Sequence, residues 1–266
     1  RDVLGSRGLG DVYKRQVCYK CVTFNKHAPM NNSYYDSLQG GSPGGDALAA
    51  RVTQVMKRVY FKMFLAMIVS GFTAWICASM GFIAFFATHS WIMWVLFGVE
   101  MVLVMSISGA LNRMTSSTAT LLFYLFAIVN GVVIFPLIYV YSGVSIAKTF
   151  FITAAVFGAM SVYGYFTGRD LSRWGSILTM CLFGLIIVAL VNIFLKSSTM
   201  EWIISVAGVI IFIGLTAWDT QQVKTMAQMA PQEYVGKLAT VGALTLYLDF
   251  INLFLLLLNF FGNSRN

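Results

Sequence analysis

Charged residues, histidine and cysteine are all scarce in this sequence. Only 11% of its 266 residues are charged, whereas soluble domains carry about 25%. A membrane serine protease would need a histidine within a spanning segment as its base, and neither His27 nor His89 lies in an apolar run. The four cysteines imply no disulfide framework, because Cys77 and Cys181 lie in separate apolar runs. These absences argue against a soluble enzyme built around one core.

Long hydrophobic runs dominate what is present, since 58% of the residues are hydrophobic. A helix rises about 1.5 Å per residue, so about 20 apolar residues cross the roughly 30 Å core of a bilayer. The sequence therefore predicts an all-α membrane protein, a bundle of seven transmembrane helices. Because the links are short, we expect any functional site to lie inside the bundle. The seven runs lie near residues 63–86, 91–111, 118–140, 148–168, 174–195, 201–225 and 238–261.

The N-terminal region lacks a spanning run. We expect residues 1–54 to form a disordered cytoplasmic leader, because the segment that follows Met30 is rich in Gly, Ser and Asn. Residues 1–29 differ in character from the rest of the chain. Our hypothesis is that Met30 is the native start and that the preceding residues are a cloning or sequence-assembly remnant. Residues 55–262 are then the seven-helix transmembrane domain, and residues 263–266 are a short tail.

The net charge of +8 indicates membrane topology rather than nucleic-acid binding. If the runs alternate across the bilayer, fifteen Lys and Arg residues fall on the side of the N-terminus. Three others, Lys148, Lys196 and Arg265, fall on the opposite side. Short loops rich in Lys and Arg stay in the cytoplasm. We therefore expect a cytoplasmic N-terminus and a C-terminus outside, with the lipid bilayer as the partner and no nucleic acid.

Three acidic residues, Glu100, Asp219 and Asp249, fall inside hydrophobic runs. A charged side chain at the bilayer centre costs about 2.5–3.5 kcal/mol on insertion scales, so such groups face the bundle interior and usually have partners. One interpretation is structural, with each acid protonated and engaged in an ordinary interhelix hydrogen bond. The other is functional, and the scarcity of basic partners within the runs favours it.

Helical spacing predicts that two of these acids meet. A polar stripe follows one face of the last run, and small and polar residues share a face of the sixth. If the sixth helix continues to Met229, Asp219 and Asp249 lie at matching depths. Two carboxyl groups at close range cannot both ionise cheaply, so we expect a shared proton and a response to cytoplasmic pH. When deprotonated, the pair would offer oxygen ligands to a hard cation such as Ca²⁺. The last-run stripe comprises Gly242, Thr245, Asp249, Asn252 and Asn259, and the sixth-run stripe comprises Ser205, Gly208, Asp219 and Gln222.

Five stretches of the sequence resemble the motifs of one membrane protein family. GLTAWDTQQVK (214–224) and LYLDFINLF (246–254) are similar to the paired motifs of the Bax inhibitor-1 family, also called the transmembrane Bax inhibitor motif family. ISGALNRMTSSTAT, NGVVIFPLIY and SVYGYFTGRDLSRWG agree in order. The resemblance covers residues 55–262, and the leader has no part in it.

The resemblance implies a seven-helix bundle with the last helix central and a pH-sensitive Ca²⁺ leak across a bacterial inner membrane. In that picture Asp219 and Asp249 match the family's pH sensor, which holds the closed state through a shared proton and rearranges on ionisation. Glu100 matches an acidic second-helix position on the ion path, and with the two aspartates it forms the candidate metal ligands. No cofactor is implied, since Ca²⁺ is the transported ion.

An arginine near the inner end of the second helix is also expected to bond the aspartate pair and complete the gate. Arg113 is the candidate in this sequence, and here the match loosens. It follows Glu100 by thirteen residues, which places it about 220° further round an ideal helix. Arg113 and Glu100 then face different ways unless the helix is irregular. Alternatively, Arg113 snorkels to the cytoplasmic interface.

Three other functions fit parts of the pattern. Intramembrane aspartyl proteases also use two membrane aspartates, and the second of these lies in a Gly-x-Gly-Asp motif. This chain has Tyr247-Leu248-Asp249 at that place, so we expect no enzyme. A proton-coupled transporter or antiporter would use paired acids well, although no internal inverted repeat is visible. A regulatory protein that binds partners in the membrane and conducts nothing also stays open.

Overall fold

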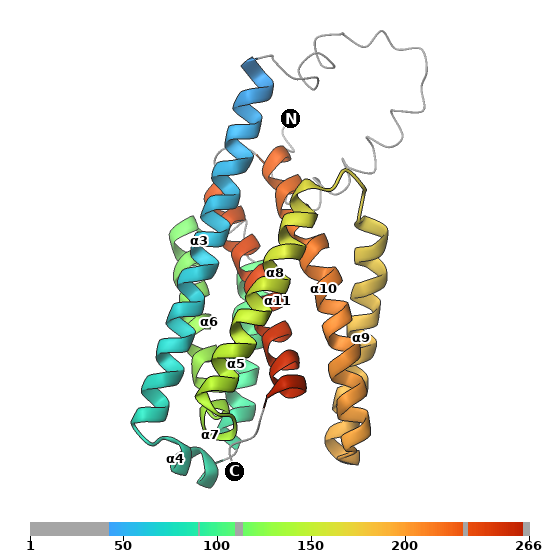
Figure 1. Cartoon of the computed structure of the whole chain (residues 1–266). Helices are drawn as coiled ribbons and strands as arrows, with labels where there is room; N and C mark the ends of the chain where they lie inside the picture. The colour runs from blue at the N-terminus through green and yellow to red at the C-terminus, as the bar shows by residue number, and fades with distance from the viewer. Residues whose placement is uncertain (1–42, 90, 110–113, 231–233, 263–266) are drawn as a thin grey trace, which may run out of the picture.

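The structure, a computed structural model, describes residues 43–89, 91–109, 114–230 and 234–262. Every regular element within these residues is a helix, labelled as in Figure 1. The helices are α3 (Pro43–Ser79), α4 (Ile83–Thr88), α5 (Trp91–Gly109), α6 (Ser116–Ile134), α7 (Leu137–Val140), α8 (Gly143–Phe166), α9 (Ser172–Leu195), α10 (Ser198–Met229) and α11 (Val235–Phe261).

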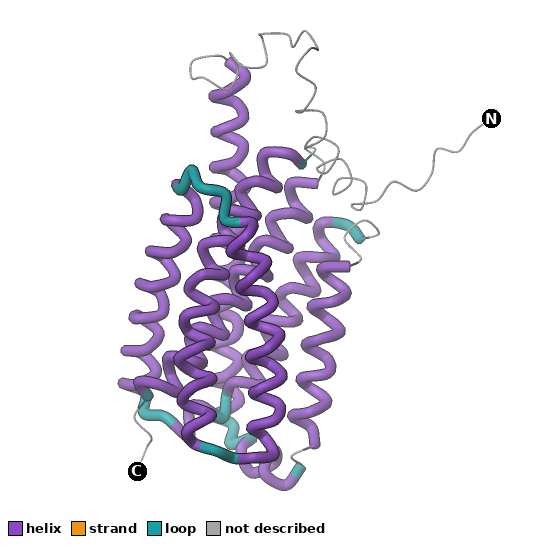
Figure 2. The backbone as a smooth tube through the Cα atoms, turned by 90° about the vertical axis from the view of Figure 1, so that its right-hand side faces the viewer, coloured by secondary structure: helices purple, strands orange, loops and turns teal. Residues whose placement is uncertain are grey.

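Seven helical segments of the described chain are long and apolar enough to cross a membrane, which confirms the predicted bundle. They run roughly parallel to one another in two views related by a quarter turn (Figure 1, Figure 2). A helix satisfies its backbone hydrogen bonds internally, which is what a chain surrounded by lipid requires. The third segment breaks at Pro136 into α6 and α7, as the proline in NGVVIFP predicts. The sixth, α10, does extend to Met229.

The first helix differs from its prediction at both ends. Helix α3 begins at Pro43, so residues 43–54 are helical and the expected disorder was wrong for them. The physical reason is an apolar stripe at helical spacing, Val52, Val55 and Val59, which is buried against the bundle despite the basic residues between its members. The helix ends at Ser79, before Gly81 adopts a φ of 72°. Residues 1–42 and 263–266, and with them the hypothesis about residues 1–29, lie outside the described residues.

Helix α11 is the central element, as the resemblance implies. Two thirds of its most apolar window is buried, more than in any other spanning helix of the described chain. It packs against α10, α3, α8, α6 and α5. Helix α9 is placed differently, because it packs chiefly on α10 and stands at the outside of the bundle (Figure 1). Most of the α9 surface is therefore left for lipid.

Two close helix crossings depend on glycine. At Gly164 in α8, an added Cβ atom would overlap the backbone carbonyl oxygen of Ala217 in α10. At Gly131 in α6, it would lie 2.6 Å from the backbone oxygen of Ser70 in α3. Small residues let helix backbones approach in this way inside membranes. These crossings fix α8 on α10 and α6 on α3.

We predict that Gly164→Ala lowers the free energy of unfolding in detergent micelles by about 1–3 kcal/mol, because the obstructing atom belongs to the backbone and α8 must move away from α10. Gly158→Ala is the matched control on the same helix, since nothing lies within 4 Å of its added Cβ atom. Equal melting temperatures for the two variants would contradict this account of the crossing.

Candidate functional site

The carboxyl groups of Asp219 and Asp249 meet between α10 and α11. They lie within hydrogen-bonding reach of each other, and the Asp249 side chain is only 5% exposed. A carboxylate oxygen can only accept, so a hydrogen bond between the two groups requires a proton on one of them. When so bonded, the pair carries at most one negative charge. The two stripes read from the sequence do face each other.

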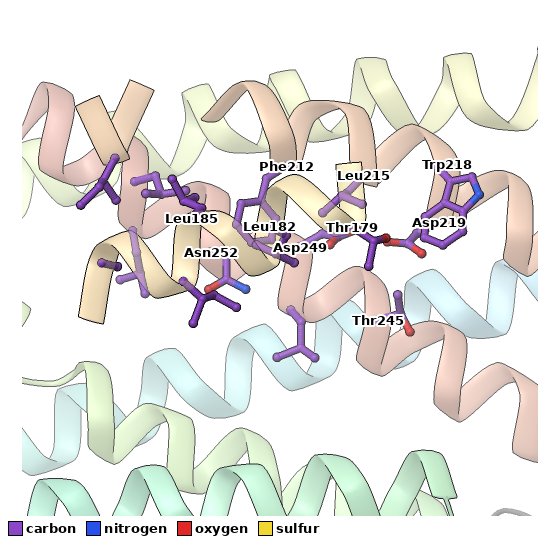
Figure 3. A pocket seen from close by; sticks show the side chains of 16 residues that line it. Thr179, Leu182, Leu185, Phe212, Leu215, Trp218, Asp219, Thr245, Asp249 and Asn252 are labelled. Carbon is purple, nitrogen blue, oxygen red and sulfur yellow. The ribbon is translucent and has the colours of Figure 1, made fainter. Parts of the chain in front are cut away.

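The aspartate pair lines a cavity of about 550 Å³ between α9, α10 and α11 (Figure 3). Its walls are mainly aliphatic, and the polar groups of Thr245 and Asn252 accompany the carboxyl pair. The lining residues within the described chain include no lysine, arginine or histidine. The full lining is Thr179, Leu182, Leu185, Ile186, Ala189, Ile204, Phe212, Leu215, Trp218, Asp219, Thr245, Leu248, Asp249, Asn252, Leu255 and Leu256.

Two buried polar atoms on this cavity lack hydrogen-bond partners within the described residues. One is Oδ2 of Asp249 and the other is Nε1 of Trp218. The Trp218 indole packs on the backbone of α9 at Gly175, where an added Cβ atom would overlap the ring. Buried polar groups usually have a partner, because an unmade hydrogen bond is costly in an apolar medium. Both atoms are thus enclosed by the chain without a partner among the described residues.

Other members of the predicted stripes lie outside the cavity. Gly242 provides a close approach to Val223, whose methyl groups would lie 2.9–3.0 Å from an added Cβ atom. Asn259, near the other end of α11, donates through Nδ2 to Ser205 Oγ at 3.0 Å and to Glu201 Oε1 at 3.3 Å. The stripe therefore serves helix packing at its ends and forms the carboxyl site only in its middle.

Glu100 belongs to a separate buried polar network. Asn130 Nδ2 donates to Glu100 Oε1 at 2.9 Å, and the Tyr247 hydroxyl donates to Asn130 Oδ1 at 2.9 Å. The Tyr247 hydroxyl also shares a hydrogen bond of 2.6 Å with Ser70 Oγ. Tyr247 and Asp249 are two residues apart, which is about 200° around a helix. The network therefore lies on the opposite face of α11 from the aspartate pair.

The structure does not assemble the three-carboxylate metal site predicted from Asp219, Asp249 and Glu100. No group of three or more His, Cys, Asp or Glu side chains that could hold a metal ion occurs in the described part of the chain. The reason is the placement of Glu100. Its carboxyl group accepts a hydrogen bond from Asn130 and lies on the opposite side of α11 from the aspartate pair. Arg113, the predicted third member of the gate, lies outside the described residues.

Three polar side chains that the sequence analysis did not single out join helices to one another and to the α8–α9 link. Lys62 Nζ donates to Thr120 Oγ1 and Thr240 Oγ1, each at 2.7 Å, joining α3, α6 and α11. Gln221 binds the α8–α9 link, accepting from Leu171 N and donating to the carbonyl of Arg169. Lys224 donates to the Tyr165 carbonyl at 2.6 Å. At the end of α10, Gln221 and Lys224 are three residues apart and share a helix face, which was the available signal for two of them.

A seven-helix bundle with a carboxyl pair between its last two helices defines a polytopic membrane protein with an acid site inside the membrane. The family model described as "Inhibitor of apoptosis-promoting Bax1" matches residues 52–266. The chain belongs to this Bax inhibitor-1 family, and it is a multi-pass integral membrane protein.

Relatives occur in several bacteria. The chain is 41% identical to the inner membrane protein YbhL of Escherichia coli strain K12 over 214 residues, covering 79% of this chain and 92% of YbhL. It is 52% identical over 156 residues to an uncharacterised protein of Rickettsia prowazekii, covering 58% of this chain and 66% of that protein. A Borreliella burgdorferi protein is 49% identical over 170 residues, covering 63% and 73%.

We predict that Tyr247→Phe lowers the free energy of unfolding by about 1–2 kcal/mol, because Asn130 Oδ1 loses its donor while the ring still packs edge-on against Phe123 and Phe126. The measurement is denaturant unfolding in mixed micelles. Tyr163→Phe is the control, since Tyr163 lies 47% exposed on α8. A loss no greater than that of the control would show that the network contributes nothing.

Proposed function

We propose that this protein is a pH-sensitive Ca²⁺ leak pathway of a bacterial inner membrane and that it catalyses no covalent reaction. The observation that carries the proposal is the pair of carboxyl groups, Asp219 and Asp249, which lie within hydrogen-bonding reach of each other on one cavity of the bundle. The family supports the fold and the membrane setting, and the name of the relative YbhL supports the inner membrane.

The gate follows from the chemistry of the pair. With one proton shared, Asp219 on α10 and Asp249 on α11 attract each other and hold the two helices together. Loss of that proton leaves two carboxylates facing each other where little solvent screens them, so they repel strongly. Helices α10 and α11 then rearrange, and four carboxylate oxygens become available to a divalent cation. Flux therefore increases as the pH rises.

The remaining predicted residues take supporting roles in this proposal. Glu100 contributes negative charge on the α5 side of α11 and lies on the ion path, while Arg113 stays a proposed third member of the gate. We propose a cytoplasmic N-terminus, since Arg169, Arg173 and Lys237 flank links at the same end of the bundle as the start of α3. The pair then responds to the proton concentration of the cytoplasm.

We predict that dye-reported Ca²⁺ entry into proteoliposomes rises from about pH 5 to about pH 9 for the wild type, as the shared proton is lost. In Asp219→Asn and Asp249→Asn the flux stays low and independent of pH, because the asparagine amide donates to the remaining carboxylate at any pH. Glu201→Gln is the matched control, since it removes an α10 carboxyl outside the cavity and should keep the wild-type profile.

The outcomes separate this proposal from its alternatives. Flux that appears only when a counter-substrate gradient is imposed would identify a proton-coupled exchanger instead. Flux at the level of empty liposomes in all variants would remove the leak pathway and favour a regulatory protein that acts through partners. A pH profile that persists unchanged in both aspartate variants would place the gate elsewhere.

We predict that Glu100→Gln reduces the amplitude of the Ca²⁺ flux but leaves its pH dependence in place. The glutamine keeps an oxygen that can accept from Asn130 Nδ2, so α5 stays docked, while the negative charge on the path is lost. Initial flux rates over the same pH series test this. Loss of the pH dependence in this variant would assign the gate to Glu100.

A further inference from the structure

The cavity that holds the aspartate pair has the properties of a ligand site as well as of a gate. Its volume of about 550 Å³ falls within the roughly 300–1,000 Å³ of small-molecule pockets, and like them it joins apolar walls to a few polar groups. Leu182, Leu185 and Phe212 are representative of the walls. One end is aliphatic, the polar end carries Asp219 and Thr245, and Asp249 lies between that end and Asn252, which is near Leu182 and Leu185 (Figure 3).

The polar end calls for a positively charged hydrogen-bond donor. Only 5% of the Asp249 side chain is exposed, and its Oδ2 atom has no partner within the described residues. The pair holds at most one negative charge when its two groups are hydrogen-bonded, and no basic side chain of the described lining neutralises that charge. A monovalent cation with N–H donors matches both that charge and the acceptor oxygens of the carboxyl pair.

The walls and the position of the cavity identify the rest of the ligand. Ile186, which lines the cavity from α9, is also 46% exposed on the outside of the bundle. Since α9 packs chiefly on α10 and not on α11, the cavity lies beside the lipid-facing surface. A ligand that arrives from the bilayer has an apolar body, and the aliphatic walls suit an alkyl chain.

We propose that the cavity between α9, α10 and α11 binds a lipophilic primary amine, with its ammonium group on the Asp219–Asp249 pair and its alkyl chain along the walls formed by α9. Binding at this site can be tested separately from ion conduction. A protein that leaks no Ca²⁺ could still bind the amine, and a conducting protein could fail to bind it.

The test is saturable binding of octylamine, protonated at neutral pH, to the full chain in lipid nanodiscs without Ca²⁺, corrected for empty nanodiscs. Octan-1-ol is the matched neutral probe. We expect octylammonium to bind at least about tenfold more tightly than octan-1-ol, because a charge-assisted hydrogen bond exceeds a neutral one. The double variant Asp219→Asn/Asp249→Asn, which leaves no carboxylate on the cavity, should abolish that difference, while Glu201→Gln, an α10 carboxyl outside the cavity, should preserve it.

A second variant keeps the test decisive if the double aspartate variant folds poorly. Ala189→Phe fills the apolar end of the cavity from α9 without changing charge, so it should weaken octylammonium binding at least about threefold by excluding the chain. Equal binding of amine and alcohol would overturn the proposal and indicate partition only. Absence of saturable binding would overturn it too, and would indicate that the cavity holds water alone. Neither outcome bears on the Ca²⁺ flux, which is measured separately.

Discussion

Two carboxyl groups in a region that water hydrates poorly impose the main constraint on this bundle. Asp219 and Asp249 can lie together only while they share a proton or bind a cation. Their surroundings fit that condition. The two groups lie between α10 and α11, they face a cavity, and aliphatic side chains surround them. A site of this kind has a charge that depends on what occupies it, which is why protons, Ca²⁺ and ammonium groups are all candidates.

The rest of the bundle keeps this pair in place by close packing rather than by further charges. Helix α11 is buried along most of its length by α10, α3, α8 and α6, and glycines at the crossings bring the backbones together. Tertiary hydrogen bonds include the Lys62 cluster and the Glu100 network, and others join Gln221 and Lys224 to the region around the α8–α9 link and Asn259 to the start of α10. Helix α9 stands apart from this packing, so the wall that it contributes to the cavity is the one least restrained by neighbours.

The sequence predicted the helices and the aspartate pair because both depend on local patterns. Apolar run length locates a spanning helix, and the 3.6-residue period places Asp249 on the polar face of the last one. The start of α3 was missed because its basic residues outweighed the stripe of Val52, Val55 and Val59. The Glu100 network could not be predicted, because Ser70, Asn130 and Tyr247 come from three different helices and no spacing within one run relates them. Trp218 became notable only once α9 was seen against it.

Helix α11 connects the aspartate pair with the Glu100 network. On one face of α11, Asp249 contacts Asp219 of α10. On the opposite face, Tyr247 bonds Asn130, which in turn bonds Glu100 of α5. An α-helix does not twist independently at positions two residues apart, so any turn or slide of α11 that parts the carboxyl groups also shifts the tyrosine hydroxyl against its acceptor. A motion of this kind would be transmitted across the bundle to α5, in which three residues are buried, Glu100, Leu103 and Ile107. Helix α5, which has few buried residues, and not the buried helix α11, is the part of the bundle that such a motion would displace furthest.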